Sequence, residues 1–149
     1  MTNKLKYFIG NWKMFGDFSS FKIVSTIAKF CSKTKKALPK KKVIFCLPNT
    51  LIQLFSSKLK NKLIIFGAQN CYYKEKYGPF TGAVSPFMLK KSGAKYVILG
   101  HSESRAMGDT NNLIKKKVKS ALKQNLNIIF CIGENLSERR KGKTFEVLK

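Results

Sequence analysis

The sequence predicts an α/β fold in which the strands of a parallel sheet alternate with helices. Short apolar runs recur at a steady interval along the 149 residues, and most consist of β-branched or aromatic residues without polar alternation. These runs comprise residues 7–9, 43–47, 63–66, 96–99 and 128–132. Runs of this kind are typical of strands that are buried on both faces of a parallel sheet.

Segments with the spacing of amphipathic helices separate the runs. They comprise residues 18–38, 50–59, 86–91, 109–126 and 138–148. The expected apolar stripes are Phe18, Phe21, Ile23, Val24, Ile27, Ala28, Cys31 and Leu38 in the first segment, and Leu113, Ile114, Val118, Ala121 and Leu122 in the fourth. Thr50, Ser85 and Asp109 stand where helix N-terminal caps are expected, and Pro86 suits the first turn.

The alternation of strands and helices predicts right-handed parallel crossovers within one unit, residues 1–149. Two architectures fit the pattern, an open doubly wound sheet or part of a (β/α)8 barrel. A complete barrel typically needs about 250 residues. Five strands in 149 residues would therefore form an incomplete one.

Composition excludes several classes of protein. The net charge is +23, but the lysines are scattered through every polar segment and there are few arginines. This distribution indicates solvated helix surfaces, so we expect no nucleic-acid partner. No apolar stretch approaches the ~20 residues that span a bilayer, and the first fifteen residues lack a signal-peptide pattern. We therefore expect no membrane association.

The cysteine and histidine spacing does not suggest a metal site or a disulfide framework. The four cysteines are Cys31, Cys46, Cys71 and Cys131, and His101 is the single histidine. There is no CxxC pair, and zinc ligands would be spaced more closely. We expect reduced thiols in a cytoplasmic protein.

Polar residues at the ends of the predicted strands are the candidates for chemistry, because ligands bind at the carboxyl ends of parallel strands. Lys13 follows the first run, inside an otherwise apolar segment, and its ammonium suits a phosphate or carboxylate substrate. His101 follows the fourth run and a glycine. A helix starting just after His101 would direct backbone N–H groups toward it and keep its ring neutral. Glu103 could serve as a structural carboxylate or as an acid–base group.

Five ordered motifs make the sequence specific. They are FIGNWKM at 8–14, GAQN at 67–70, GPFTGAVSP at 78–86, YVILGHSESR at 96–105 and CIGE at 131–134. Together they resemble the triosephosphate isomerase family over nearly the whole chain. The resemblance implies a (β/α)8 barrel of which this chain forms βα units 1 to about 5. It also implies the interconversion of dihydroxyacetone phosphate and D-glyceraldehyde 3-phosphate through an enediolate, in glycolysis and gluconeogenesis, without cofactor or metal.

The resemblance also implies roles for single residues. Asn11 and Lys13 match positions that contact the triose phosphate, and Lys13 would stabilise the enediolate charge. His101 would donate a hydrogen bond to the carbonyl, and Glu103 matches a carboxylate that contacts Lys13. This family is the reference case for a neutral histidine beside a glutamate base, so the mechanism is inherited from the resemblance.

Further residues match supporting positions in the family. Cys131, Glu134 and Ser102 are expected to support the site, and Thr81 is expected at the interface of a homodimer. The family carries an acid where this chain has Ala83 and an arginine where it has Ser104. In many relatives that acid and arginine pair across the interface. Because both are replaced, no charge is left unpaired, and we expect a retained but less electrostatic dimer.

Half of the family's site is expected to be missing from these residues. The general base lies on the family's sixth strand and is followed by a closing lid, and both would fall beyond residue 149. We therefore expect the 149 residues to be inactive alone, as a partial gene product, an incomplete sequence or half of a split gene. The alternatives are a nonenzymatic polyanion-binding remnant of the fold and a complete, smaller phosphosugar binder with an open sheet.

Overall fold

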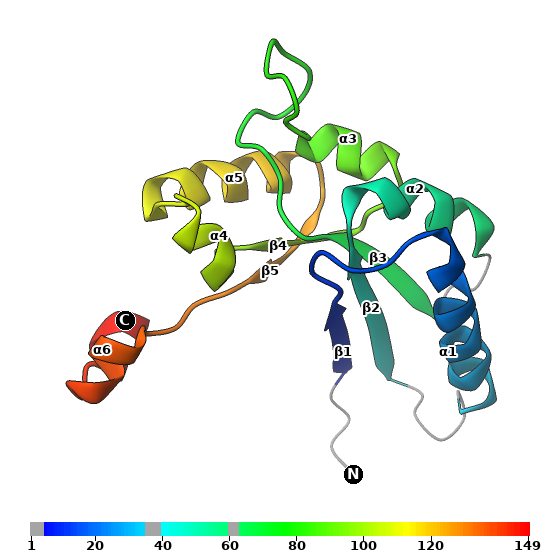
Figure 1. Cartoon of the computed structure of the whole chain (residues 1–149), viewed down its shortest axis with the longest axis horizontal. Coiled ribbons are helices and arrows are strands. Elements are labelled where there is room, and N and C mark those ends of the chain that lie inside the picture. The colour runs from blue at the N-terminus through cyan, green and yellow to red at the C-terminus, as the bar shows by residue number, and fades with distance from the viewer. Residues whose placement is uncertain (1–4, 35–39, 60–62) are drawn as a thin grey trace.

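The computed structural model describes residues 5–34, 40–59 and 63–149. Within these residues the strands are β1 (Lys6–Asn11), β2 (Lys41–Leu47), β3 (Ile64–Ala68), β4 (Tyr96–Leu99) and β5 (Asn127–Phe130). They form a parallel sheet in the order β1-β2-β3-β4-β5, so each strand lies beside its neighbours in the sequence. The sheet curls in the way expected for part of a barrel (Figure 1).

The helices follow the strands in the predicted alternation. The longer ones are α1 (Phe21–Lys33), α2 (Asn49–Lys58), α3 (Pro86–Lys91) and α5 (Asn111–Lys123). The remaining ones are the 3-10 turn η1 (Phe18–Ser20), α4 (Ser102–Ala106), α6 (Leu136–Arg140) and α7 (Thr144–Leu148). Beyond β5 the chain runs away from the sheet to α6 and the C-terminus (Figure 1).

Two apolar clusters occupy the two faces of the sheet. The larger one packs side chains of α1, α2, α3 and α5 against alternate strand residues such as Leu47, Phe66 and Val97. The smaller one joins Ile44, Cys46, Tyr96 and Ile98 on the opposite, concave face. Because side chains alternate between the two faces along a strand, neighbouring residues such as Cys46 and Leu47 belong to different clusters.

The prediction that the strands are buried on both faces is wrong for the first and the last. The side chains of Tyr7, Phe8 and Ile9 in β1 are about half exposed, and so is that of Phe130 in β5. β1 and β5 are the edge strands of the sheet, so each has a neighbouring strand on one side only. Figure 1 shows β1 standing apart from α5 and α6.

Several helix boundaries also differ from the prediction. The first helix begins at Phe21, after a turn capped by Asp17, and this geometry leaves Phe18 and Ile23 exposed. The end of that segment at 35–38, with Leu38, lies outside the described residues. The predicted cap Thr50 is instead a residue of α2, which begins at Asn49 without a side-chain cap.

Corrections apply to the later helices as well. Thr110, not Asp109, caps α5, because its hydroxyl accepts from the N–H of Leu113 at 3.2 Å. Leu122 is exposed at the end of the same helix. The single helix expected at 138–148 is two short ones, because Gly142 between them adopts the left-handed φ of +69° that ends a helix.

The cap expected for the third predicted helix is confirmed. The Ser85 hydroxyl caps α3, with Pro86 in the first turn, as predicted. All four cysteines are unpaired. In the part of the chain that the structure describes, no helix combines the length and the apolar character needed to cross a bilayer.

Candidate active site at the carboxyl ends of the strands

Lys13 follows β1 in an unusual backbone conformation. The β1–β2 ladder extends past Asn11 through a hydrogen bond from the Trp12 N–H to the Cys46 carbonyl at 3.0 Å. Lys13 then takes a φ of +52°, in the left-handed region that residues with a Cβ rarely occupy. The side-chain oxygen of Asn11 accepts the Lys13 N–H at 3.0 Å. Asn11 therefore helps to hold the turn that presents the lysine.

The Lys13 side chain meets the residues that follow β4. Its Nζ donates to Oε1 of Glu103 at 2.7 Å, a contact between residues 90 positions apart. This hydrogen bond holds the pKa of the Glu103 carboxyl below its ordinary value, so the carboxylate stays charged. The structure thus contains the Lys13–Glu103 contact that the sequence led us to expect.

His101 lies at the start of α4, beside the same carboxylate. Its Nδ1 accepts the backbone N–H of Glu103 at 3.2 Å, and Nδ1 is 3.5 Å from the Glu103 Oε2. A ring nitrogen that accepts an N–H carries no proton of its own. The neutral tautomer that fits this contact bears its proton on Nε2, which is then free to donate to a ligand.

The backbone before His101 is fixed by a glycine and an arginine. Gly100 has a left-handed φ of +77°, and a Cβ there would lie 2.8 Å from the Cys131 carbonyl oxygen. The guanidinium of Arg105 donates from Nε to the Gly100 carbonyl at 2.7 Å and from Nη1 to the Asn111 side chain at 2.7 Å. Arg105 therefore ties the end of β4 to the start of α5.

The expected supporting residues are not all in one place. Cys131 follows β5 and packs beside the concave cluster that contains Cys46, where burial raises its pKa. Ser102 is an exposed first residue of α4. Thr81 lies exposed in the loop between β3 and α3.

Glu134 makes its contacts outside the group of Lys13, Glu103 and His101, which we call the Lys13 cluster. Its carboxylate accepts hydrogen bonds from Thr144 at 3.2 Å and from Arg139 at 3.3 Å. A hydrogen bond from its own backbone N–H is the main cause of its lowered pKa. In this structure Glu134 therefore joins the start of α6 to the start of α7.

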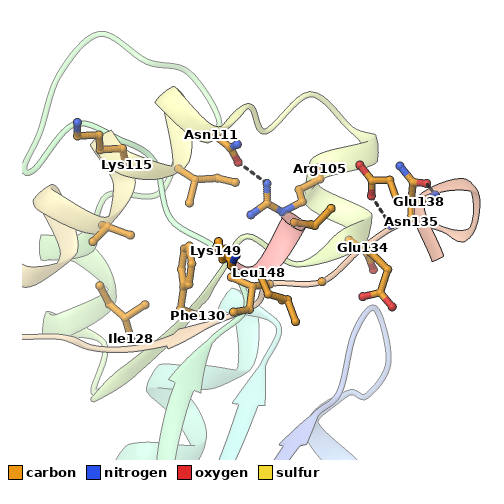
Figure 2. Close-up of a pocket in the computed structure, with 16 residues that line it drawn as sticks. Arg105, Asn111, Lys115, Ile128, Phe130, Glu134, Asn135, Glu138, Leu148 and Lys149 are labelled. Atoms are coloured by element: carbon orange, nitrogen blue, oxygen red, sulfur yellow. Dashed lines mark hydrogen bonds between the residues drawn. The ribbon is translucent and has the colours of Figure 1, made fainter. Parts of the chain in front are cut away.

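A pocket of about 1100 Å³ lies beside the candidate site (Figure 2). Ile128, Phe130 and Leu148 form part of its apolar wall, and Arg105 lies at its polar side, hydrogen-bonded to Asn111. Its lining includes Ser102 and Glu134 but not the Lys13 cluster. Among the described residues, no three His, Cys, Asp or Glu side chains are placed to hold a metal ion.

Sequence reasoning gave no role to four residues that organise this end of the sheet, namely Gln69, Asn70, Arg105 and Lys117. Gln69 donates from Nε2 to the carbonyls of Lys13 and Cys46. Asn70 accepts from the buried Lys117 ammonium at 3.0 Å. Arg105 holds Gly100 as described above. The position of Gln69 and Asn70, directly after the third apolar run, was the signal that could have found these two.

Comparisons with known proteins agree with the resemblance seen in the sequence. The family model described as triosephosphate isomerase matches residues 6–149. The triosephosphate isomerase of Dictyoglomus thermophilum is 42% identical over 144 residues, which cover 96% of this chain and 56% of that protein. The enzyme of the same name from Thermoanaerobacter pseudethanolicus is 40% identical over 93% of this chain and 54% of its own length.

A solved structure supports the same relationship. The crystal structure of triosephosphate isomerase from Bartonella henselae superposes with a TM-score of 0.87 at 36% sequence identity. The match covers 95% of this chain and 57% of that one. The chain therefore spans about half the length of the relatives that it matches.

Proposed function

The chain belongs to the triosephosphate isomerase family, and on that premise we propose that it supplies the electrophilic half of an active site. The complete site interconverts dihydroxyacetone phosphate and D-glyceraldehyde 3-phosphate. The observation that carries this proposal is the pairing of Lys13 with Glu103 at 2.7 Å, next to a His101 ring whose Nε2 is free to donate.

In this proposal the side chains of His101, Lys13 and Asn11 act on the substrate. Removal of a proton from the carbon beside the carbonyl generates an enediolate, whose negative charge lies on oxygen. The Nε2–H of His101 donates to that oxygen and moves protons between the two oxygens of the enediolate. The Lys13 ammonium, which lies beside the same Glu103 carboxylate as His101, lowers the energy of the anion, and Asn11 contacts the substrate.

Proton abstraction is assigned to the part of the barrel that these five strands do not include. In the family the general base follows the sixth strand, and a lid then closes over the intermediate. Without that lid, water would reach the enediolate and favour loss of phosphate. We therefore propose that residues 1–149 alone do not turn the substrate over at a useful rate.

The setting that we propose for the reaction is the cytoplasm, and the active form is a homodimer. Four unpaired thiols agree with a reducing compartment. The net charge of +23 favours the approach of anionic triose phosphates. Thr81 is exposed in the long β3–α3 loop, where it is accessible to a second protomer.

The proposal is tested with protein expressed from its complete reading frame. If that frame encodes these residues only, the remaining strands are supplied as a separate polypeptide from the Bartonella henselae relative. Coupled assays in both directions should show isomerisation, and His101→Gln should lower kcat by about 10²–10⁴-fold. Lys22→Met, on the exposed side of α1, is the matched control for a Lys13→Met variant. Absence of isomerisation with all eight strands present would overturn the proposal.

A further inference from the structure

We propose that Gln69 is a positioning residue of the candidate site, because its side-chain amide holds the strained backbone of Lys13. This inference rests on the role of Lys13 in the proposed function. It concerns a residue that contacts the backbone behind the lysine, not the substrate. Three observations support it.

The first observation is the conformation of Lys13. Its φ of +52° places it in the left-handed region, which is disfavoured by about 1–2 kcal/mol for a residue with a Cβ. Among the described residues, the other non-glycine residue with a positive φ is Asn125, of a type that tolerates this region well. A lysine keeps such a conformation only where its surroundings impose it.

The second observation is the geometry of the Gln69 amide. Its Nε2 donates to the Lys13 carbonyl at 2.7 Å and to the Cys46 carbonyl at 3.1 Å. An amide nitrogen has two hydrogens, and each is used by one of these carbonyls. One side chain at the end of β3 thereby fixes the residues that follow β1 and end β2.

The third observation is that little else fixes the lysine side chain. The side chains of Lys13 and Glu103 are both about half exposed, so packing does not define where the ammonium lies. The direction of the side chain is set by the backbone at Lys13, and the backbone is held from two sides. The Asn11 side chain accepts the Lys13 N–H, and Gln69 donates to the Lys13 carbonyl.

This arrangement predicts a specific consequence of losing the donor. Without it, the Lys13 peptide relaxes toward negative φ and the ammonium moves away from Glu103 and from the substrate. A displacement of about 1 Å in such a group can lower the rate by about 10²-fold. Replacing the amide with a carboxylate, as in Gln69→Glu, should have a larger effect than removing it, as in Gln69→Met. The carboxylate places acceptor oxygens against two carbonyl oxygens.

The test uses Gln69→Glu, Gln69→Met and the control Gln53→Glu, which makes the same change on an exposed position of α2. In protein with all eight strands, Gln69→Glu should lower kcat/KM by about 10–100-fold, and Gln53→Glu should leave it unchanged. Lys13→Met should have much less effect in the Gln69→Glu background than in the wild type. Equal effects of Lys13→Met in the two backgrounds would overturn the proposal.

A second readout separates this inference from the proposed function. The Glu103 carboxyl is titrated by ¹³C NMR in the wild type and in Gln69→Met, which removes the donors without adding a charge. If Gln69 holds Lys13 beside Glu103, the titration midpoint of Glu103 rises in the variant and stays unchanged in Gln53→Glu. An unchanged midpoint in Gln69→Met contradicts the inference even if the wild type shows no isomerase activity.

Discussion

The ammonium of Lys117 donates to both carboxylate oxygens of Asp109 at 2.7 Å, and both side chains are at least nine-tenths buried. The same ammonium also donates to the side chain of Asn70 at 3.0 Å. Lys117 in α5 is thereby joined to the segment that follows β3 and to the residue before the Thr110 cap. This network fixes α5 against the segment that follows β3.

Removing the lysine from this network should destabilise the fold strongly. Lys117→Met leaves the Asp109 carboxylate buried without its cation, and breaking a buried pair in this way costs about 3–5 kcal/mol. Lys119→Met, on the exposed side of the same helix, should change stability by less than about 0.5 kcal/mol. Urea unfolding of both variants checks the difference. Similar midpoints would show that the pair contributes little.

The Lys13–Glu103 pair predicts a shift in a titration. The Lys13 hydrogen bond holds the pKa of Glu103 below its ordinary value, so the pair stabilises the fold above the ordinary pKa of a glutamate, about 4.3. That stabilisation is lost as pH falls through the lowered pKa. In Lys13→Met the Glu103 pKa should rise toward its ordinary value, as measured by ¹³C NMR. The same shift in Lys22→Met would exclude Lys13 as the cause.

The residues of the candidate site could be singled out from the sequence because they are polar and directly follow predicted strands. Lys13, His101 and Glu103 follow β1 and β4, and parallel strands bring those ends to one edge. The family resemblance also predicted that Glu103 contacts Lys13. The left-handed φ of Lys13 and its hydrogen bond from Gln69 could not be predicted, because they depend on the register between strands and on contacts between residues far apart in the sequence.

The fold was less predictable at its edges than at its centre. A run such as Tyr7-Phe8-Ile9 predicts a buried strand because all its residues are apolar. Apolar composition alone does not distinguish a central strand from an edge strand. Whether a second face is covered depends on the position of the strand in the sheet, which is long-range information. The cap of α5 was wrongly predicted at Asp109 for a related reason, because the contact that decides it also comes from elsewhere in the chain. The Asp109 carboxylate accepts a hydrogen bond from Lys117 further along α5, and Thr110 is the cap.

The cysteines should differ in their reaction with alkylating reagents. Burial raises the pKa of Cys46 to about 12, and that of Cys71 to about 12 as well. At pH 8 only about one in 10⁴ of these thiols is a thiolate, and neither is accessible. Cys131 is only partly buried, so it should react with iodoacetamide first. Mass spectrometry of partly modified protein would locate the adduct, and first modification at Cys46 would contradict the structure.

The single tryptophan should report on the core beneath the site. The ring of Phe55 is fully buried and lies edge-on to Trp12, with ring centroids 6.1 Å apart. Phe55→Ala should cost about 3–5 kcal/mol and shift the tryptophan emission to the red, because the cavity loosens the packing around the indole. Phe30→Ala removes an exposed ring and is the control. Equal emission spectra for the two variants would place Trp12 outside this core.

The two departures from the family at the proposed dimer interface should be energetically coupled. Ala83 lies in the β3–α3 loop and Ser104 in α4. At these two positions the family resemblance implies an acid and an arginine that pair between protomers. Each single change, Ala83→Glu or Ser104→Arg, adds a charge without its partner and should weaken the dimer or leave it unchanged. Together they create the cross-protomer pair, so the double variant should bind more tightly than the sum of the single effects predicts, by about 0.5–3 kcal/mol. Sedimentation equilibrium of the four proteins, each with all eight strands, measures this coupling. Strict additivity would mean that the two positions do not face each other across an interface, and the homodimer proposed from the family would then need a different contact surface.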